Sequence, residues 1–183
     1  IEIGPTYSAL SNLATLAYQM RDFQEAIEHY RQALAIDSHD HRVWASLAAA
    51  LAGSGSPPER VAEAVREAVD RAERLREVNP NDPLLLAGLA QYYSQLREST
   101  SARRLVERAL ELEPDRVDVL LMAAHVLDDL EDRAAARRAL IRALDQGASA
   151  DTLRGDPGYA RLLADPEITE RFTERDEVKG EKP

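Results

Sequence analysis

Apolar residues recur three and four positions apart along most of the chain, the spacing that gathers side chains on one face of an α-helix. Short polar, glycine or proline-containing stretches interrupt this pattern, as in GSGSPP at residues 53–58 and NPND at residues 79–82. Each uninterrupted block is long enough for about three or four helical turns. The pattern therefore predicts an all-α protein made of short helices joined in pairs.

The helix pairs recur as four units, which we place at residues 7–40, 41–82, 83–116 and 117–150. Each unit carries alanine at the same place in its first and its second helix, namely at Ala14, Ala48, Ala90 and Ala124, and at Ala26, Ala68, Ala102 and Ala136. Small side chains at these positions let two helices approach closely while bulkier neighbours fill the space between them. We therefore predict that the alanines mark the helix crossings.

This arrangement resembles the tetratricopeptide repeat, a 34-residue helix-turn-helix unit with small and large apolar residues at fixed offsets. The resemblance covers about residues 7–150. It implies a right-handed α-solenoid of repeats followed by a C-terminal helical cap, with no catalytic role. As is usual in this family, the concave groove would bind a peptide or another protein.

The second unit, residues 41–82, is about eight residues longer than the others. Its helical spacing continues without a break from Val61 to Leu75, so we predict one elongated second helix. Eight residues add about 12 Å to a helix. Two interpretations stay open: a variation that the family tolerates, or a contact surface.

We expect other elements at the two ends of the chain. Residues 1–6 resemble the end of a preceding repeat, so that the N-terminal face would expose apolar side chains and support a weak homodimer. The side chains that we expect on this face are Ile1, Ile3, Tyr7 and Leu10. Residues 151–174 contain two Asp-Pro helix starts and would form the cap, whereas residues 175–183 would form a flexible tail.

The family resemblance also implies which residues line the peptide-binding groove, all of them on the first helices of the units. They are Ser11, Thr15 and Tyr18; Arg42, Ala45 and Ala49; Leu84, Ala87, Gln91 and Gln95; and Asp118, Leu121, His125, Asp128 and Asp129. Because Asp118, Asp128 and Asp129 make one end acidic, we expect a partner with apolar anchors and basic flanks.

The composition disfavours several kinds of partner and activity. A formal net charge of −10 disfavours nucleic acid and anionic membranes as partners, and no apolar run approaches the roughly 20 residues of a membrane helix. Cysteine is absent, and no nucleophile-elbow, phosphate-loop or zinc-hydrolase motif occurs, so we predict no enzyme activity, no metal and no cofactor. The compartment stays open, with cytoplasm favoured and periplasm an alternative.

The arginine bias, 21 of the 23 basic residues, is typical of GC-rich bacterial genomes. The elongated helix, VNPNDPLLLAGLAQYY at residues 78–93 and the Asp-Pro end piece resemble the C-terminal repeat regions of bacterial signalling proteins. These include serine/threonine kinases and transcriptional regulators. We therefore expect an interaction scaffold within a larger bacterial protein. The alternatives are a self-association module and a subdomain of an enzyme encoded upstream.

Overall fold

A computed structural model describes residues 6–171, except for the side chain of Pro157. These residues form helices and no strand, which confirms the all-α prediction. They divide into two compact units, residues 6–80 with 95–97 and residues 81–94 with 98–171, and each unit is described separately. The predicted repeat remnant and the predicted tail fall largely or wholly outside the described residues, as do Ile1 and Ile3.

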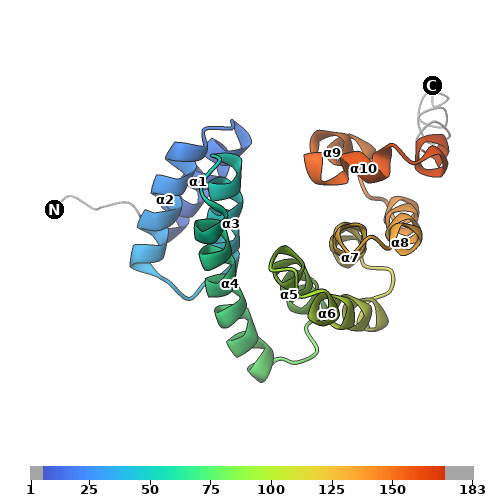
Figure 1. Cartoon of the computed structure of the whole chain (residues 1–183), viewed down its shortest axis with the longest axis horizontal. Helices are drawn as coiled ribbons and strands as arrows, with labels where there is room; N and C mark the ends of the chain where they lie inside the picture. Colours follow the sequence, from blue (N-terminus) through green and yellow to red (C-terminus); the bar gives the residue numbers. More distant parts are fainter. Residues whose placement is uncertain (1–5, 172–183) are drawn as a thin grey trace. The chain divides into compact units, whose positions relative to one another are not determined.

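Unit 1 contains two helical hairpins (Figure 1). The first pairs α1 (Tyr7–Gln19) with α2 (Phe23–Ile36), and the second pairs α3 (His41–Gly53) with α4 (Pro58–Val78). The two hairpins are in contact through α2 with α3 and through α1 with α3. Since α1 and α3 are neighbours, the first helices of the two hairpins share one side of the unit.

Unit 2 contains the remaining helices. Four of them follow as α5 (Pro83–Gln95), α6 (Ser99–Leu112), α7 (Val117–Asp129) and α8 (Arg133–Asp145). Short turns of three residues join α5 to α6 and α7 to α8, and contacts of α7 with both α6 and α8 stack one hairpin on the next. The same hairpin unit is therefore repeated in this part of the chain.

The chain after α8 forms shorter helical segments. These are α9 (Ala150–Gly155), the 3-10 turn η1 (Pro157–Tyr159) and α10 (Ala160–Leu163), and residues 166–171 are also helical. Leu153, Leu162 and Ile168 are buried at 3% exposure or less. This segment thus adds its own apolar side chains to the core of unit 2, as a terminal cap must.

The alanines predicted at the helix crossings are all buried. All eight are at most 1% exposed: Ala14, Ala26, Ala48, Ala68, Ala90, Ala102, Ala124 and Ala136. Large side chains such as Leu89, Leu120, Leu140 and Leu144 are buried around them. Fully buried alanines surrounded by leucine are what close helix packing requires.

The hairpin turns share one backbone conformation. Arg21, Arg97 and Glu131 have φ of 62°, 63° and 62°, and Gly55 has φ of 72° at the equivalent place in the second hairpin. In the first turn, the amide of Asp22 donates to the carbonyl of Ala17, the bond that closes a Schellman motif. The left-handed turn residue is therefore a repeated feature of all four hairpins.

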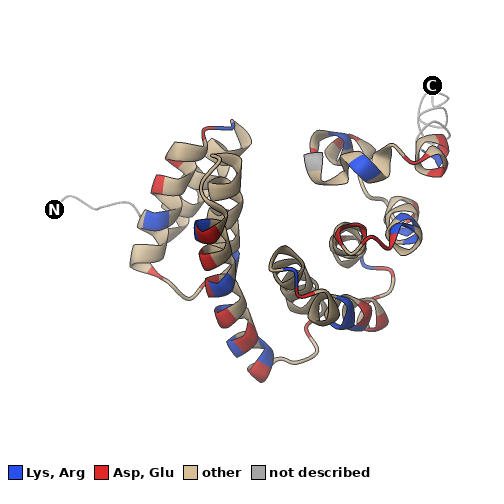
Figure 2. Ribbon diagram, in the orientation of Figure 1, with Lys and Arg blue, Asp and Glu red and all other residues tan. Residues whose placement is uncertain are grey.

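The second hairpin has one elongated helix, since α4 has 21 residues where the other hairpin helices have 13 or 14. Basic and acidic residues follow one another along it (Figure 2), and pairs such as Arg74 with Asp70 lie one turn apart. Its last turns leave Leu75 47% and Val78 85% exposed. The extension thus ends in apolar surface.

Of the residues predicted for an apolar N-terminal face, Leu10 is wrong, because it is buried at 3% exposure. Tyr7 is half-buried, and its hydroxyl donates to Asp40. Instead Leu13, Leu16 and Met20 of α1 are 47%, 54% and 74% exposed. Their spacing of three and four residues places them on one side of the helix.

Candidate functional site

The predicted groove residues of unit 1 lie on two neighbouring helices, α1 and α3. Thr15 and Ala49 are exposed, Tyr18 is 38% exposed, and Ala45 is half-buried. The Thr15 hydroxyl donates to the carbonyl of Ser11 at 2.9 Å. This side of the unit therefore offers small side chains and hydroxyl groups.

Two larger side chains flank this surface. Tyr18 packs edge-on against Phe23 of α2, with ring centroids 5.6 Å apart, which restrains its ring. Arg42 is held by Asp40, whose Oδ2 lies 2.9 Å from Nη2 and whose Oδ1 lies 3.1 Å from Nε. Both candidate anchors are thus oriented in the absence of a partner.

Asp40 also connects α1 to the start of α3. It caps α3 by accepting from the Arg42 amide at 2.9 Å, and its Oδ2 accepts from the Tyr7 hydroxyl at 2.8 Å. Burial would raise the pKa of Asp40, but the hydrogen bonds from Arg42 and Tyr7 outweigh it and lower the pKa to about 2. Burial and the bond to Asp40 raise the pKa of Tyr7 to about 12.

The predicted groove residues on α5 differ in their exposure. Leu84 and Gln91 are half-buried and Gln95 is exposed, but Ala87 is fully buried. Ala87 belongs to the core and cannot contact a partner, so its assignment to the groove is wrong.

The cap segment covers much of the predicted surface of α7. Tyr159 donates to the carbonyl of Leu121 at 3.1 Å, and its ring lies edge-on to His125 with centroids 6.1 Å apart. A Cβ atom on Gly158 would lie 3.1 Å from Nε2 of His125, so these segments are closely packed. Leu121 and His125 are accordingly half-buried, and part of the predicted groove is already occupied by the chain itself.

One of the three carboxylates at the predicted acidic end is buried in an ion pair. Asp128 is 4% exposed, and Arg161 of the cap donates to its Oδ2 at 2.8 and 3.0 Å, so Asp128 is a structural residue rather than an exposed groove residue. Asp129 accepts from Ser94 at 3.3 Å, and Asp118 lies 3.9 Å from Arg116. Of the three predicted carboxylates, Asp118 and Asp129 remain exposed enough to attract a basic partner.

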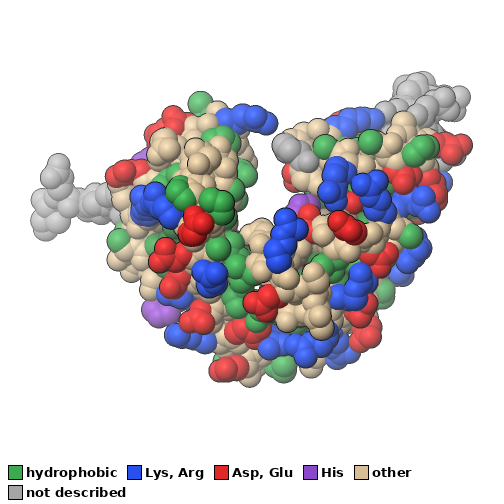
Figure 3. Space-filling model, viewed as in Figure 1, with side chains coloured by type: hydrophobic (Ala, Val, Ile, Leu, Met, Phe, Trp, Pro, Cys, Tyr) green, Lys and Arg blue, Asp and Glu red, His purple; other side chains and the backbone are tan. Residues whose placement is uncertain are grey.

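Other kinds of site find little support in the described part of the chain. No group of three or more His, Asp or Glu side chains in residues 6–171 is placed to hold a metal ion. Among the described helices, none combines the length and apolar character needed to cross a membrane. Figure 3 shows acidic and basic side chains interspersed over the visible face of both units, without a segregated basic area.

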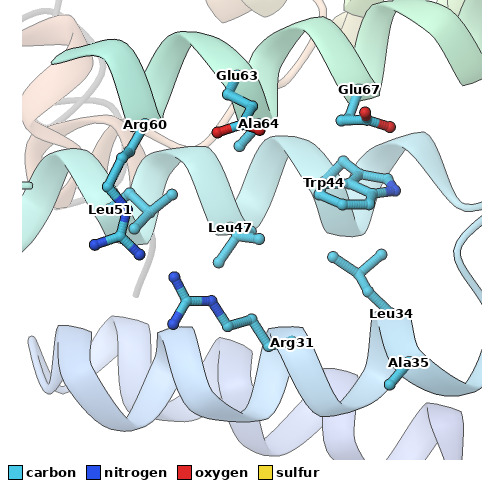
Figure 4. Close-up of a pocket in the computed structure, with 10 residues that line it drawn as sticks. All are labelled: Arg31, Leu34, Ala35, Trp44, Leu47, Leu51, Arg60, Glu63, Ala64 and Glu67. Atoms are coloured by element: carbon cyan, nitrogen blue, oxygen red, sulfur yellow. The ribbon is translucent and has the colours of Figure 1, made fainter. Parts of the chain in front are cut away.

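The sequence did not reveal a pocket in unit 1 between α2, α3 and α4. It has a volume of about 400 Å³, with Leu34, Trp44, Leu47 and Leu51 among its lining residues (Figure 4). The pocket opens between α2 and α4, the second helices of the two hairpins, above α3. The spacing of residues within one helix does not predict such a gap between two helices.

Known repeat proteins are similar to this chain in sequence and in fold. Residues 7–40, the first hairpin, match the family model described as tetratricopeptide repeat. No curated protein matches the sequence. Among solved structures, TTC0263, a thermophilic TPR protein of Thermus thermophilus, is 17% identical with a TM-score of 0.58; the alignment covers 92% of this chain and 98% of that one.

Two other solved structures are similar at lower TM-scores. MamA is 17% identical, with a TM-score of 0.49 and coverage of 99% of this chain and 98% of that one. Pseudomonas aeruginosa pilF is 21% identical, with a TM-score of 0.49 and coverage of 93% of this chain and 71% of that one.

Repeated helical hairpins with buried alanines at their crossings define a helical-repeat protein of the α-solenoid class. The match of the first hairpin to the tetratricopeptide repeat model, together with the fold shared with TTC0263, supports assignment to the tetratricopeptide-repeat family. Such repeats generally mediate protein–protein interaction and generally act as noncatalytic scaffolds.

Proposed function

We propose that this chain is a noncatalytic scaffold that binds a peptide or protein segment through the exposed groove positions of its first helices. The observation that supports it best is the side of unit 1 formed by α1 and α3, which contact each other. There Thr15 and Ala49 leave room for a ligand backbone, and Tyr18 and Arg42 are restrained in position. Restrained aromatic and arginine side chains are the residues that most often dominate binding energy.

Within unit 2, the surface of α7 favours a segment with basic residues beside its apolar anchors. Asp118 and Asp129 supply the negative charge there, and Asp128 does not contribute because Arg161 neutralises it. Exposed carboxylates contribute at most about 1 kcal/mol per pair, so apolar contacts supply most of the affinity. Charge then governs the association rate and the orientation of the ligand.

We further propose that the module belongs to a larger bacterial protein, as the regulatory repeat region of a serine/threonine kinase or a transcriptional regulator. The arginine-rich composition and the resemblance of residues 78–93 to such regions support this context. The full-length gene tests it, because a kinase or a DNA-binding domain upstream is expected and an unrelated neighbour would overturn it.

A peptide array probed with the purified chain tests the binding function. Peptides with apolar anchors and basic flanks should bind, and Tyr18→Ala with Arg42→Ala should weaken them about tenfold or more. A matched double variant at exposed residues away from these helices, Arg104→Ala with Arg138→Ala, should leave binding unchanged. If only acidic peptides bind, or if the first double variant has no effect, this site is wrong.

Self-association is a second candidate function, favoured by the exposed side chains of Leu13, Leu16 and Met20 on one side of α1. In an array, such a face would be covered by another repeat or another copy. Sedimentation at increasing concentration should show a dimer that Leu16→Glu abolishes. A monomer at all concentrations would exclude this function.

A further inference from the structure

The pocket of unit 1 combines an apolar floor with an unevenly charged rim. Leu47 and Leu51 of α3 are buried at 4% and 3% exposure, and Leu34 of α2 is 7% exposed. Arg31 of α2 and Arg60 of α4 rise from opposite walls and extend toward the same end, beside Leu51 (Figure 4). An apolar side chain can therefore enter between two walls that each carry a cation.

The far end of the pocket is already neutral and rigid. Glu67 forms an ion pair with Arg71, and the Arg71 guanidinium lies 5.1 Å above the ring centroid of Trp44. Arg71 Nε and Trp44 Nε1 both donate to the carbonyl of Ser38, at 2.7 and 2.9 Å. These contacts hold the indole in place, so Trp44 forms a fixed wall rather than a mobile side chain.

The arginines at the other end lack such partners. Within residues 6–171, neither the Arg31 nor the Arg60 side chain makes a hydrogen bond or an ion pair, and both residues are exposed. Glu63, on the same wall as Arg60, is also exposed and unpaired in the described structure. The rim therefore carries two unpaired guanidinium groups, of Arg31 and Arg60, and one unpaired carboxylate, of Glu63, so its net charge is positive.

We propose that this pocket docks an amphipathic helix of a partner protein, with an apolar side chain over Leu47 and an acidic residue one turn away between Arg31 and Arg60. Charge complementarity selects this occupant, because a basic segment would place its cations beside the two free guanidinium groups. A helix with apolar anchors three or four residues apart matches a pocket walled by two helices.

This site is separate from the surface invoked in the proposed function. Successive helical residues are about 100° apart, so Trp44, Leu47 and Leu51 face the opposite side of α3 from Arg42, Ala45 and Ala49. The inference therefore goes beyond groove binding, and variants on one side of α3 do not alter the other.

Trp44 is the single tryptophan of the chain, so its fluorescence reports on the pocket directly. The probes are two synthetic amphipathic peptides of about 15 residues without tryptophan. They share one leucine stripe, and they carry either glutamate or lysine beside it. We expect the glutamate peptide to shift the Trp44 emission and to bind about tenfold more tightly than the lysine peptide at low salt.

Charge reversal tests the arginines. Arg31→Glu with Arg60→Glu should reverse the preference between the two peptides, whereas Arg66→Glu, an exposed arginine elsewhere on α4, should leave the preference in place. Circular dichroism would verify that each variant is folded. If the two peptides shifted the Trp44 emission of the unmodified protein at equal concentrations, the acidic partner would be overturned, since binding of the lysine peptide at the groove would not be read by Trp44.

Blocking variants test the location. Ala35→Phe would place a ring at the exposed α2 wall and should abolish the response of Trp44, whereas Ala49→Phe, on the opposite side of α3, should not. If neither peptide changes the emission of Trp44, or if Ala49→Phe abolishes binding and Ala35→Phe does not, the proposed site is wrong. Dimerisation of the protein, lost in Ala35→Phe, would identify a second copy as the occupant and overturn the partner helix.

Discussion

Arg161 joins the cap to the last hairpin through Asp128. Its Nη2 donates to both Oδ2 and the backbone carbonyl of Asp128, at 2.8 and 2.9 Å, and its Nε donates to Oδ2 at 3.0 Å. The Asp128 side chain is only 6% exposed, whereas Arg161 is 58% exposed. A carboxylate that would be costly to bury alone is therefore satisfied by a residue 33 positions later in the chain.

Removing this arginine should detach the cap. We expect Arg161→Ala to lower the free energy of unfolding by about 1–2 kcal/mol, toward the low end of a charged hydrogen bond because solvent reaches the guanidinium. Amide exchange in residues 150–163 should accelerate more than exchange in α7. Arg104→Ala, at an exposed arginine with no ion pair among the described residues, serves as the control and should change neither quantity. Equal effects of the two variants would contradict the role of Asp128.

The fold was more predictable from sequence than the site, for a physical reason. A position such as Ala14 or Ala136 recurs in every unit, and a small residue among leucines has one economical explanation, a helix crossing. Asp128 has the same periodic position as Tyr18 and Ala52, which are both exposed. Nothing in its local spacing reveals that Arg161 approaches it, because that contact depends on how the cap folds back.

The misassignments of Ala87 and Leu10 have a related cause. Ala87 was predicted in the groove from its place in the repeat, and Leu10 on an exposed N-terminal face. Exposure depends on all the elements packed around a residue, and both side chains are buried. The pocket beside Trp44 was missed because its walls come from three helices. Periodicity describes one helix at a time and does not show where two neighbours separate.

The bond between Tyr7 and Asp40 should stabilise the junction of the first two hairpins. We expect Tyr7→Phe to lower the free energy of unfolding by about 1 kcal/mol at neutral pH, because Asp40 loses a donor. Tyr18→Phe is the matched control, since the Tyr18 hydroxyl has no hydrogen-bond partner within the described residues. Urea unfolding of both variants makes the comparison.

The bond between Tyr7 and Asp40 also predicts how the stability of the native state depends on pH. The pKa of Asp40 is lowered from 3.8 to about 2 by folding, so its ionised form stabilises the native state above pH 3.8. That contribution should be lost as the pH falls through about 2. In Tyr7→Phe, NMR titration should show a higher pKa for Asp40. An unchanged pKa would mean that Arg42 alone lowers it.

Two glycines in helices should respond oppositely to alanine. A Cβ atom on Gly53 would lie 2.6 Å from the ring of Phe23, whereas on Gly88 its nearest neighbour would be the Tyr92 hydroxyl at 3.9 Å. We expect Gly53→Ala to displace Phe23 and to destabilise by about 1 kcal/mol or more. Gly88→Ala should stabilise by about 0.5–1 kcal/mol through helix propensity. Thermal unfolding would show midpoints shifted in opposite directions, and a rise for Gly53→Ala would mean that Phe23 moves freely.

The left-handed turn residues give a prediction that applies to every hairpin. Arg21, Arg97 and Glu131 hold φ near 62°, a conformation that glycine adopts without the steric penalty of a side chain. Replacing each by glycine should raise the free energy of unfolding by about 0.5–1 kcal/mol. This net gain is the strain relieved in the turn minus the stabilisation of the unfolded chain by the greater flexibility of glycine. Gly55→Ala, at φ of 72° with open space around it, should lower it by a similar amount through backbone strain alone.

An arginine in regular helix distinguishes this effect from a general response to glycine. Arg66→Gly, inside α4, should lower the free energy of unfolding by about 1 kcal/mol. The residue there already has helical φ, so glycine relieves no strain and only makes the unfolded chain more flexible. Urea unfolding of the five variants makes the comparison at constant pH and salt. If Arg97→Gly destabilised as much as Arg66→Gly, the Arg97 side chain would have to contribute contacts that outweigh the strain of its turn.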